Sequence, residues 1–164
     1  MTQNLQTSGE SVSVQGKLNE FLVELDKQTN AILPIKNPVD SSIEEVLNLT
    51  YEQLSNIDQQ ECQILCYKLS QYATYIQKVY NRNKNIRRWA ESNINVMVGK
   101  YGSQYGDKWV KFEEKRSALI ADNEYVRSLA KLALTYASLE DELFEIADRV
   151  RYISQALIGI KNVK

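Results

Sequence analysis

The sequence predicts an all-α protein in which two long heptad-patterned helices pair as a hairpin, with short helices before them. Three observations lead to this fold class. The chain of 164 residues has only 6 Gly and 2 Pro, and these two residue types are the usual breakers of helices. Both prolines, Pro34 and Pro38, lie in the first quarter. Two later stretches carry apolar residues at steps that alternate between four and three, which is the pattern of a coiled-coil seam.

The N-terminal part predicts a tail followed by short acidic helices. Residues 1–15 are rich in Ser, Gln and Thr and short of apolar side chains, which predicts a disordered tail. Residues 16–57 form the second unit, in which "PIKNPVDSS", about 34–42, predicts a linker and "SIEEVLNL" two further helical turns. The linker follows a short amphipathic helix over 17–33, whose apolar positions are Leu18, Phe21, Leu22 and Leu25.

The third unit, residues 58–164, begins with the first long helix. Thr50 and Gln53 have the spacing of a capping box, and Asp58 with Glu61 repeats it where the long helix should start. We expect Gly99 and the "YGSQYGD" that follows to end this helix. Its seam is Leu65, Leu69, Tyr72, Ile76, Val79, Asn83, Ile86, Ala90, Asn93 and Met97. The asparagines either fix the register of the seam or mark a part of the helix that is not packed.

The second long helix has the most regular pattern in the chain. Asp122 is the expected N-cap, and the seam then runs from Tyr125 to Ile160. A stripe this long exceeds what the weaker first seam needs, so we expect a homo-oligomer that assembles through residues 125–160. The predicted contact residues are Leu129, Leu132, Tyr136, Leu139, Leu143, Ile146, Val150, Ile153 and Leu157.

The composition argues against catalysis and against a metal site. No His is present, which removes the usual general base for Ser or Cys catalysis, and no phosphate-binding loop or dinucleotide fingerprint occurs. Cys62 and Cys66 are four residues apart, and no second pair could complete a zinc site with them. Two reduced thiols are therefore expected. We predict a non-enzymatic protein without cofactor or metal.

Hydropathy predicts a protein of the cytoplasm with no membrane partner. The longest purely apolar runs are only a few residues, too short to span a bilayer. The N-terminus lacks the basic and apolar regions of a signal peptide.

The net charge of −1 conceals an asymmetry along the chain. Residues 1–61 contain 3 basic and 10 acidic side chains, whereas residues 62–116 contain 11 basic and 4 acidic ones. The middle third therefore carries the charge that attracts a polyanion.

Within this middle third, "YNRNKNIRRW", residues 80–89, has four cations and no acid. The heptad pattern turns the cations outward and the aromatic residues toward the edge of the seam. Such a surface suits a nucleic-acid strand, because bases stack on rings and phosphates pair with Lys and Arg. The alternative is the ordinary charged face of a long helix. The binding interpretation assigns the contact to Lys78, Arg82, Lys84, Arg87, Arg88 and Trp89.

The stretch "GKYGSQYGDKWVKF", residues 99–112, has the composition of a binding loop. Lys and aromatic residues alternate in it, and its three glycines let backbone approach a ligand closely. The alternative is an ordinary turn whose rings pack into the hairpin end, with Asp107 capping the next helix. The binding interpretation adds Lys100, Tyr101, Tyr105, Lys108, Trp109 and Lys111 to the predicted site.

From about residue 60 to 161, the order of segments resembles the phage UvsY-type recombination mediators. A basic helix precedes a Tyr- and Gly-containing loop, "KYGSQYGD", and a short charged helix, "KFEEKRSAL". "ADNEYVRSLAKL" then opens a long terminal helix that ends "VRYISQALIGIK". The family's basic residues cluster just before the loop, whereas most cations here lie earlier, at 78–88.

This resemblance implies a protein that binds single-stranded DNA and helps load a RecA-like recombinase onto strands coated by single-strand binding protein. It also implies assembly through the C-terminal helix and, for a phage-encoded protein, a location in the host cytoplasm. Two alternatives stay open: a coiled-coil structural or assembly protein of a virus, and a helical adaptor that binds a protein through its hairpin tip. The acidic segment before residue 58 either lies on the basic third and competes with DNA or contacts a protein partner.

Overall fold

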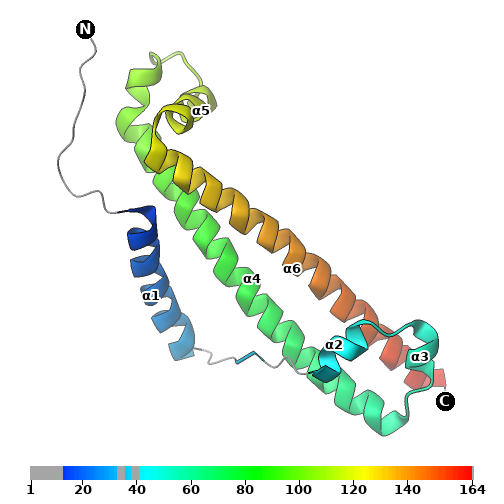
Figure 1. Cartoon of the computed structure of the whole chain (residues 1–164). Helices are drawn as coiled ribbons and strands as arrows, with labels where there is room; N and C mark the ends of the chain where they lie inside the picture. Colours follow the sequence, from blue (N-terminus) through cyan, green and yellow to red (C-terminus); the bar gives the residue numbers. More distant parts are fainter. Residues whose placement is uncertain (1–12, 33–35, 38–40, 164) are drawn as a thin grey trace.

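The computed structural model describes residues 13–32, 36–37 and 41–163. Within these ranges the chain contains helices and turns and no strand, so the predicted all-α class is confirmed. Its frame is a hairpin of two long helices, α4 (Gln59–Tyr101) and α6 (Glu124–Val163), which lie side by side (Figure 1). A helix as long as α4 extends for about 65 Å.

The start of α4 is the one predicted, and its end lies two residues beyond Gly99, within the predicted stop. The Asp58 carboxylate accepts a hydrogen bond of 2.8 Å from the Glu61 backbone amide and caps the helix. Gly99 does not stop the helix, which continues to Tyr101 and then as a 3₁₀ turn, η1 (Gly102–Tyr105). The chain leaves the helical path at Gly106, where φ is +147°. A Cβ at this position would lie 2.5 Å from the Val110 side chain, so only glycine fits there.

The return to α6 passes through α5 (Phe112–Asp122). The predicted N-cap of α6, Asp122, is instead the last residue of α5. Asn123 has the extended backbone that an N-cap needs, and its Oδ1 accepts a hydrogen bond of 3.1 Å from the Val126 amide. The prediction failed because either Asp or Asn can cap a helix, and the backbone conformation of the turn decides between neighbours.

Three short helices precede the hairpin. α1 (Val14–Ile32) lies beside the hairpin, antiparallel to α4 and in contact with α6 as well. α2 (Ser41–Leu47) and α3 (Tyr51–Ser55) cover the far end of the hairpin (Figure 1). The Thr50 and Gln53 capping box is present at α3. Because α1 begins at Val14, the end of the predicted 1–15 tail is helical, and the rest of that tail lies outside the described residues. Most of the 34–42 linker also lies outside them.

The apolar core consists of two clusters. The open-end cluster joins α2, α3, the start of α4 and the end of α6: Val46, Leu54, Cys62, Leu65, Leu69, Ile76, Val150, Ile153 and Leu157. The tip-end cluster joins the end of α4, α5 and the start of α6: Ala90, Ile94, Val98, Leu119, Val126, Leu129 and Ala133. Between the clusters lies a polar layer, which we define as Asn83, Arg87 and Glu140.

The contact surface of each long helix drifts away from its heptad seam. Near the end of α4, Ile94 and Val98 are buried in place of the predicted Asn93 and Met97. At the start of α6, Val126 and Ala133 are buried, next to the predicted Tyr125 and Leu132. A straight helix has 3.6 residues per turn, so it drifts from a strict repeat of 3.5 by about 20° per heptad. The prediction of Asn83 in the seam was correct, whereas the Asn93 amide bonds the Trp89 carbonyl oxygen at 2.8 Å.

Candidate nucleic-acid interface

The outward side of α4 carries a line of polar residues that we call the exposed row: Asn81, Asn85, Arg88, Ser92 and Asn95. All five side chains are exposed, and their steps of four and three place them on one side of the helix. No member of the row is acidic. Its amide, hydroxyl and guanidinium groups are the donors that bind phosphate oxygens.

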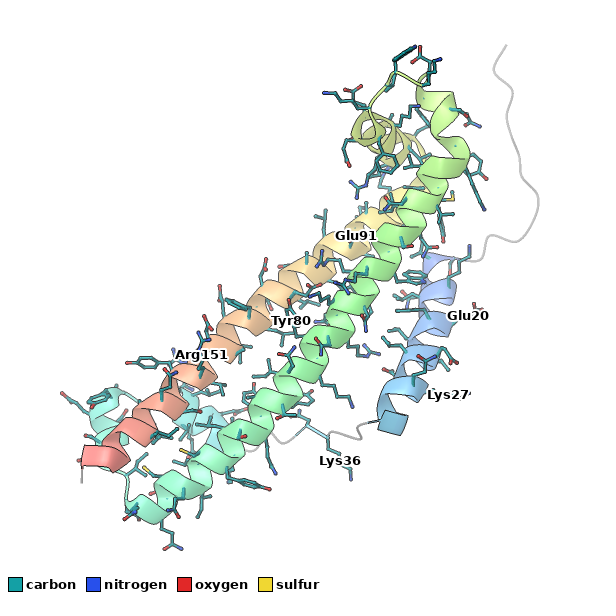
Figure 2. The ribbon with its side chains drawn as sticks, turned by 180° about the vertical axis from the view of Figure 1, so that it is seen from behind. Glu20, Lys27, Lys36, Tyr80, Glu91 and Arg151 are labelled. Carbon is teal, nitrogen blue, oxygen red and sulfur yellow. The ribbon has the colours of Figure 1, made fainter. Side chains whose placement is uncertain are left out.

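The cations beside the exposed row differ in how open they are. Arg88 is exposed, whereas Lys84 is half-buried and its ammonium lies 5.5 Å from the centre of the Tyr80 ring. Lys78 is also half-buried. The single acid between residues 62 and 106 is Glu91, and its carboxylate is held by Arg87 at 3.2 Å (Glu91 and Tyr80 are labelled in Figure 2). The surface around Arg88 therefore has a positive potential.

Arg87 belongs to the packing seam and not to this surface. Its Nε and Nη2 donate hydrogen bonds of 2.8 and 3.1 Å to the two carboxylate oxygens of Glu140, which is buried on α6. This hydrogen bonding raises the pKa of Arg87 above its ordinary value. The structure thus corrects the assignment of Arg87 as a nucleic-acid contact. The next residue, Arg88, is an exposed cation, whereas the Arg87 guanidinium is bound by a carboxylate of another helix.

The other two predicted residues at the edge of the seam, Arg82 and Trp89, are covered by α1. Arg82 donates two hydrogen bonds of 3.0 Å to the Asp26 carboxylate, which lowers the pKa of Asp26 and raises that of Arg82. The Trp89 ring is stacked on Phe21, with ring centres 5.6 Å apart and an interplanar angle of 20°. While α1 is in this position, the Arg82 guanidinium and one face of the Trp89 ring are engaged by α1, and both side chains are only partly accessible.

The hairpin tip, which we define as residues 100–112, exposes large aromatic and basic side chains together. Trp109 is 80% exposed, Phe112 48% and Tyr101 41%. Lys100, Lys108 and Lys111 are exposed beside them, and the Lys108 ammonium lies 5.0 Å from the centre of the Trp109 ring. The predicted turn with rings packed into the hairpin end is therefore wrong for Trp109, whose ring points into solvent.

Two hydrogen bonds shape this tip. The Asp107 carboxylate accepts one of 2.8 Å from the Trp109 amide, so Asp107 stabilises the turn and does not cap α5, which begins after Lys111. The Tyr105 hydroxyl donates one of 2.7 Å to Asp122, which raises the pKa of Tyr105. Tyr105 is half-buried and ties η1 to the end of α5. It supports the tip, and its hydroxyl, which was predicted to contact nucleic acid, is bonded to Asp122.

Charges of both signs follow the hairpin tip, which sets it apart from the exposed row. Glu113 and Glu114 are exposed directly after Phe112, and Lys115 and Arg116 behind them are half-buried. The sequence prediction named Arg88 but left Asn81, Asn85, Ser92 and Asn95 out of the site residues. Their steps of four and three, on the side opposite the seam, were the signal that could have identified them.

The predicted oligomerisation residues divide into three sets by their exposure. Leu129, Val150, Ile153 and Leu157 are buried inside the hairpin, and Leu132, Tyr136 and Leu143 are half-buried. Leu139 and Ile146 remain 36% and 37% exposed. Much of the apolar stripe on α6 therefore packs against the same chain, and Leu139 and Ile146 are its accessible part.

The described residues contain no cluster of three or more His, Cys, Asp or Glu side chains suited to a metal ion. A small pocket of about 190 Å³ is lined by Cys62, Gln63, Cys66, Leu157 and Ile158, and neither cysteine forms a disulfide. In the part of the chain that the structure describes, every helix is too short or too polar to pass through a bilayer. Comparisons with protein-family models, with curated proteins and with solved structures give no match for this chain.

Proposed function

We propose that this chain is a non-enzymatic, homo-oligomeric protein that binds single-stranded DNA as an accessory factor of recombination or repair in the cytoplasm. The observation that carries the proposal is the exposed row on α4, which is free of acids and leads toward a tip with an 80% exposed tryptophan. A charged helix face that serves only for solubility usually carries both signs of charge.

The chemistry of the two surfaces is complementary to a single strand. Arg88 and Lys84 attract phosphates, and the neighbouring amides of Asn81 and Asn85 donate hydrogen bonds to phosphate and base oxygens. At the tip, the Trp109 ring offers a stacking surface for a base, and Lys108 lies close enough to neutralise the adjacent phosphate. Stacking needs unpaired bases, which favours a single strand over a duplex.

A role in loading a RecA-like recombinase onto strands coated by single-strand binding protein follows from the resemblance to UvsY-type mediators. It is supported by the order of a basic helix, a Tyr/Gly loop, a short charged helix and a long terminal helix over about residues 60–161. For a phage-encoded chain, the place of action is the cytoplasm of the host.

The proposal is tested by fluorescence anisotropy of a labelled oligothymidine at several salt concentrations. We expect binding at low salt, and the logarithm of the binding constant should fall linearly with the logarithm of the salt concentration, because bound cations displace counterions from the strand. A duplex of the same length should bind more weakly. Absence of binding at low salt would contradict the proposal.

The exposed tip favours a second candidate, a helical adaptor that docks on another protein through Trp109. Large exposed aromatic side chains are common anchors of protein interfaces. An adaptor would bind no oligothymidine at any salt concentration, and the anisotropy experiment therefore separates the two candidates.

A further inference from the structure

Helix α1 lies over two residues that the sequence assigned to nucleic-acid binding. Its contacts follow one line along the hairpin: the Lys17 ammonium is 5.0 Å from the centre of the Tyr125 ring, Phe21 stacks on Trp89, and Asp26 pairs with Arg82. Because the residue numbers rise on α1 as they fall on α4, the two helices are antiparallel.

The groups that α1 presents to α4 resemble those of a nucleotide. The Asp26 carboxylate meets the guanidinium of Arg82 with two parallel hydrogen bonds of 3.0 Å, and a phosphate binds this planar fork in the same way. The Phe21 ring covers Trp89 at 5.6 Å and 20°, which is the position that a stacked base takes on an aromatic side chain. Asp26 thus takes the place of a phosphate on Arg82, and Phe21 takes the place of a base on Trp89.

We infer that Arg82 and Trp89 form a nucleotide-binding subsite for one phosphate and one base, which α1 occupies until a single strand displaces it. This inference rests on the proposed function. The subsite lies on the edge of α4, beside the exposed row. When α1 leaves, the Arg82 guanidinium becomes available to a phosphate and the Trp89 ring to a base, in addition to Lys84 and Arg88.

The attachment of α1 is weak enough for such an exchange. Among the side chains described in residues 14–28, only Leu18 is buried. Val14, Phe21, Leu22 and Leu25 are half-buried, Val14 against the tip-end cluster. The side chains of Arg82 and Asp26 are 37% and 46% exposed, and ion pairs this exposed contribute little to stability. A ligand that repeats both contacts can therefore replace α1.

The test uses the full chain and two matched double variants. Asp26→Asn with Phe21→Ala removes the anion and the ring that cover the subsite. Glu20→Gln with Val23→Ala removes one charge and one apolar side chain of the same helix, and both residues are exposed. Glu20 points away from α4 (Figure 2). Circular dichroism checks that each variant keeps its helical content.

The measured quantity is the affinity for a labelled oligothymidine at low salt. We expect the Asp26/Phe21 variant to bind about three- to tenfold more tightly than the unaltered chain, because α1 no longer competes, and the Glu20/Val23 variant to bind like the unaltered chain. Equal affinity in all three proteins would overturn the inference and leave the proposed function intact. Loss of binding in all three would overturn the proposed function itself.

Two further measurements examine the subsite directly. Arg82→Ala in the Asp26/Phe21 background should weaken binding again, and an unchanged affinity would show that Arg82 is no phosphate ligand. In a Trp109→Phe chain, Trp89 is the remaining tryptophan, since the sequence has 2. Oligothymidine should quench its fluorescence by stacking, and binding without any change in Trp89 emission would overturn the inference.

Discussion

Arg87 and Glu140 join α4 and α6 through two hydrogen bonds, of 2.8 and 3.1 Å, between the two apolar clusters of the core. Glu140 is buried and Arg87 is 29% exposed. A charge in such a position is tolerated only with its partner, because an unpaired buried ion loses its hydration without compensation. The pair therefore favours the register in which residue 87 lies opposite residue 140.

We expect Arg87→Ala to lower the free energy of unfolding by about 3 kcal/mol, because it leaves the Glu140 carboxylate buried without its counter-ion. Arg88→Ala is the matched control, since Arg88 is the next residue and is exposed. The control should change stability by less than about 0.5 kcal/mol. Urea unfolding followed by circular dichroism measures both values, and similar losses in the two variants would contradict the structural role of Arg87.

Arg87→Met combined with Glu140→Leu should restore most of the stability that Arg87→Ala loses. Replacement of a buried ion pair by apolar side chains of similar volume is often neutral or stabilising. Light scattering should then show whether the register of α4 and α6 has shifted, because a shifted register exposes apolar surface and raises the mass through association. A double variant as unstable as Arg87→Ala would show that the pair contributes more than charge compensation.

For nucleic-acid binding we expect the loss of Arg88 to matter more than the loss of Arg87, the reverse of their effects on stability. Lys84→Ala with Arg88→Ala should weaken oligothymidine binding and reduce the slope of log affinity against log salt by roughly 0.7 for each phosphate that the variant no longer neutralises. Lys131→Ala is the control, because Lys131 is an exposed cation on α6. A salt slope unaffected by the removal of Lys84 and Arg88 would place the phosphate-binding surface away from the exposed row.

Trp109→Ala should weaken oligothymidine binding by about 1–3 kcal/mol, the usual contribution of one stacked base. Thermal stability should not change, because the side chain is 80% exposed. Trp109→Phe should keep part of the affinity. Tyr51→Ala on α3, another exposed aromatic residue, provides the control, and an equal loss of affinity in this variant would contradict a specific role for the tip.

The contact between α1 and α4 should depend on pH through Asp26. The pKa of its carboxyl lies below the ordinary value of 3.8, chiefly because of the hydrogen bonds to Arg82. The contact therefore adds stability above pH 3.8, and this contribution disappears as the pH falls through the lowered pKa. In the Trp109→Phe chain, Trp89 emission should shift to longer wavelength as α1 loosens in this range. The same shift in an Asp26→Asn chain would exclude Asp26 as its cause.

Self-association should depend on the accessible part of the α6 stripe. Light scattering at micromolar concentration should give a mass above the 18.9 kDa of one chain. Leu139→Lys with Ile146→Lys should reduce it to the monomer value, because the two exposed side chains are seven residues apart on one face. Leu134→Lys is the control on another face, at a residue that is 72% exposed. A monomeric unaltered chain would contradict the predicted oligomer.

The elements of the fold were predictable because their signals are local. The Asp58 cap and the Thr50–Gln53 box depend on residues within one turn, and both were predicted correctly. The sequence placed the end of α4 in a short stretch without giving its last residue, because both Gly99 and Gly106 can break a helix. The structure shows a positive φ and a close approach of Val110 at Gly106, whereas a Cβ at Gly99 would meet nothing within 4 Å.

The site was less predictable, because its cations are alike in sequence and differ in their distant partners. Arg82 meets Asp26, 56 residues away, and Arg87 meets Glu140, 53 residues away, whereas Arg88 is exposed. A heptad assignment gives the direction of each side chain to within a fraction of a turn. It contains no information on which carboxylate another helix brings to that place.

The separation of the apolar core into two clusters has a consequence for the local unfolding of the hairpin. Each cluster is closed by its own short helices, and between them lie the polar layer and the buried Ile86, which belongs to neither cluster. Segments that are weakly packed against each other unfold as separate cooperative units. Amide hydrogen exchange should therefore find two protected regions with different opening free energies, and the tip end can rearrange around a ligand while the open end remains closed.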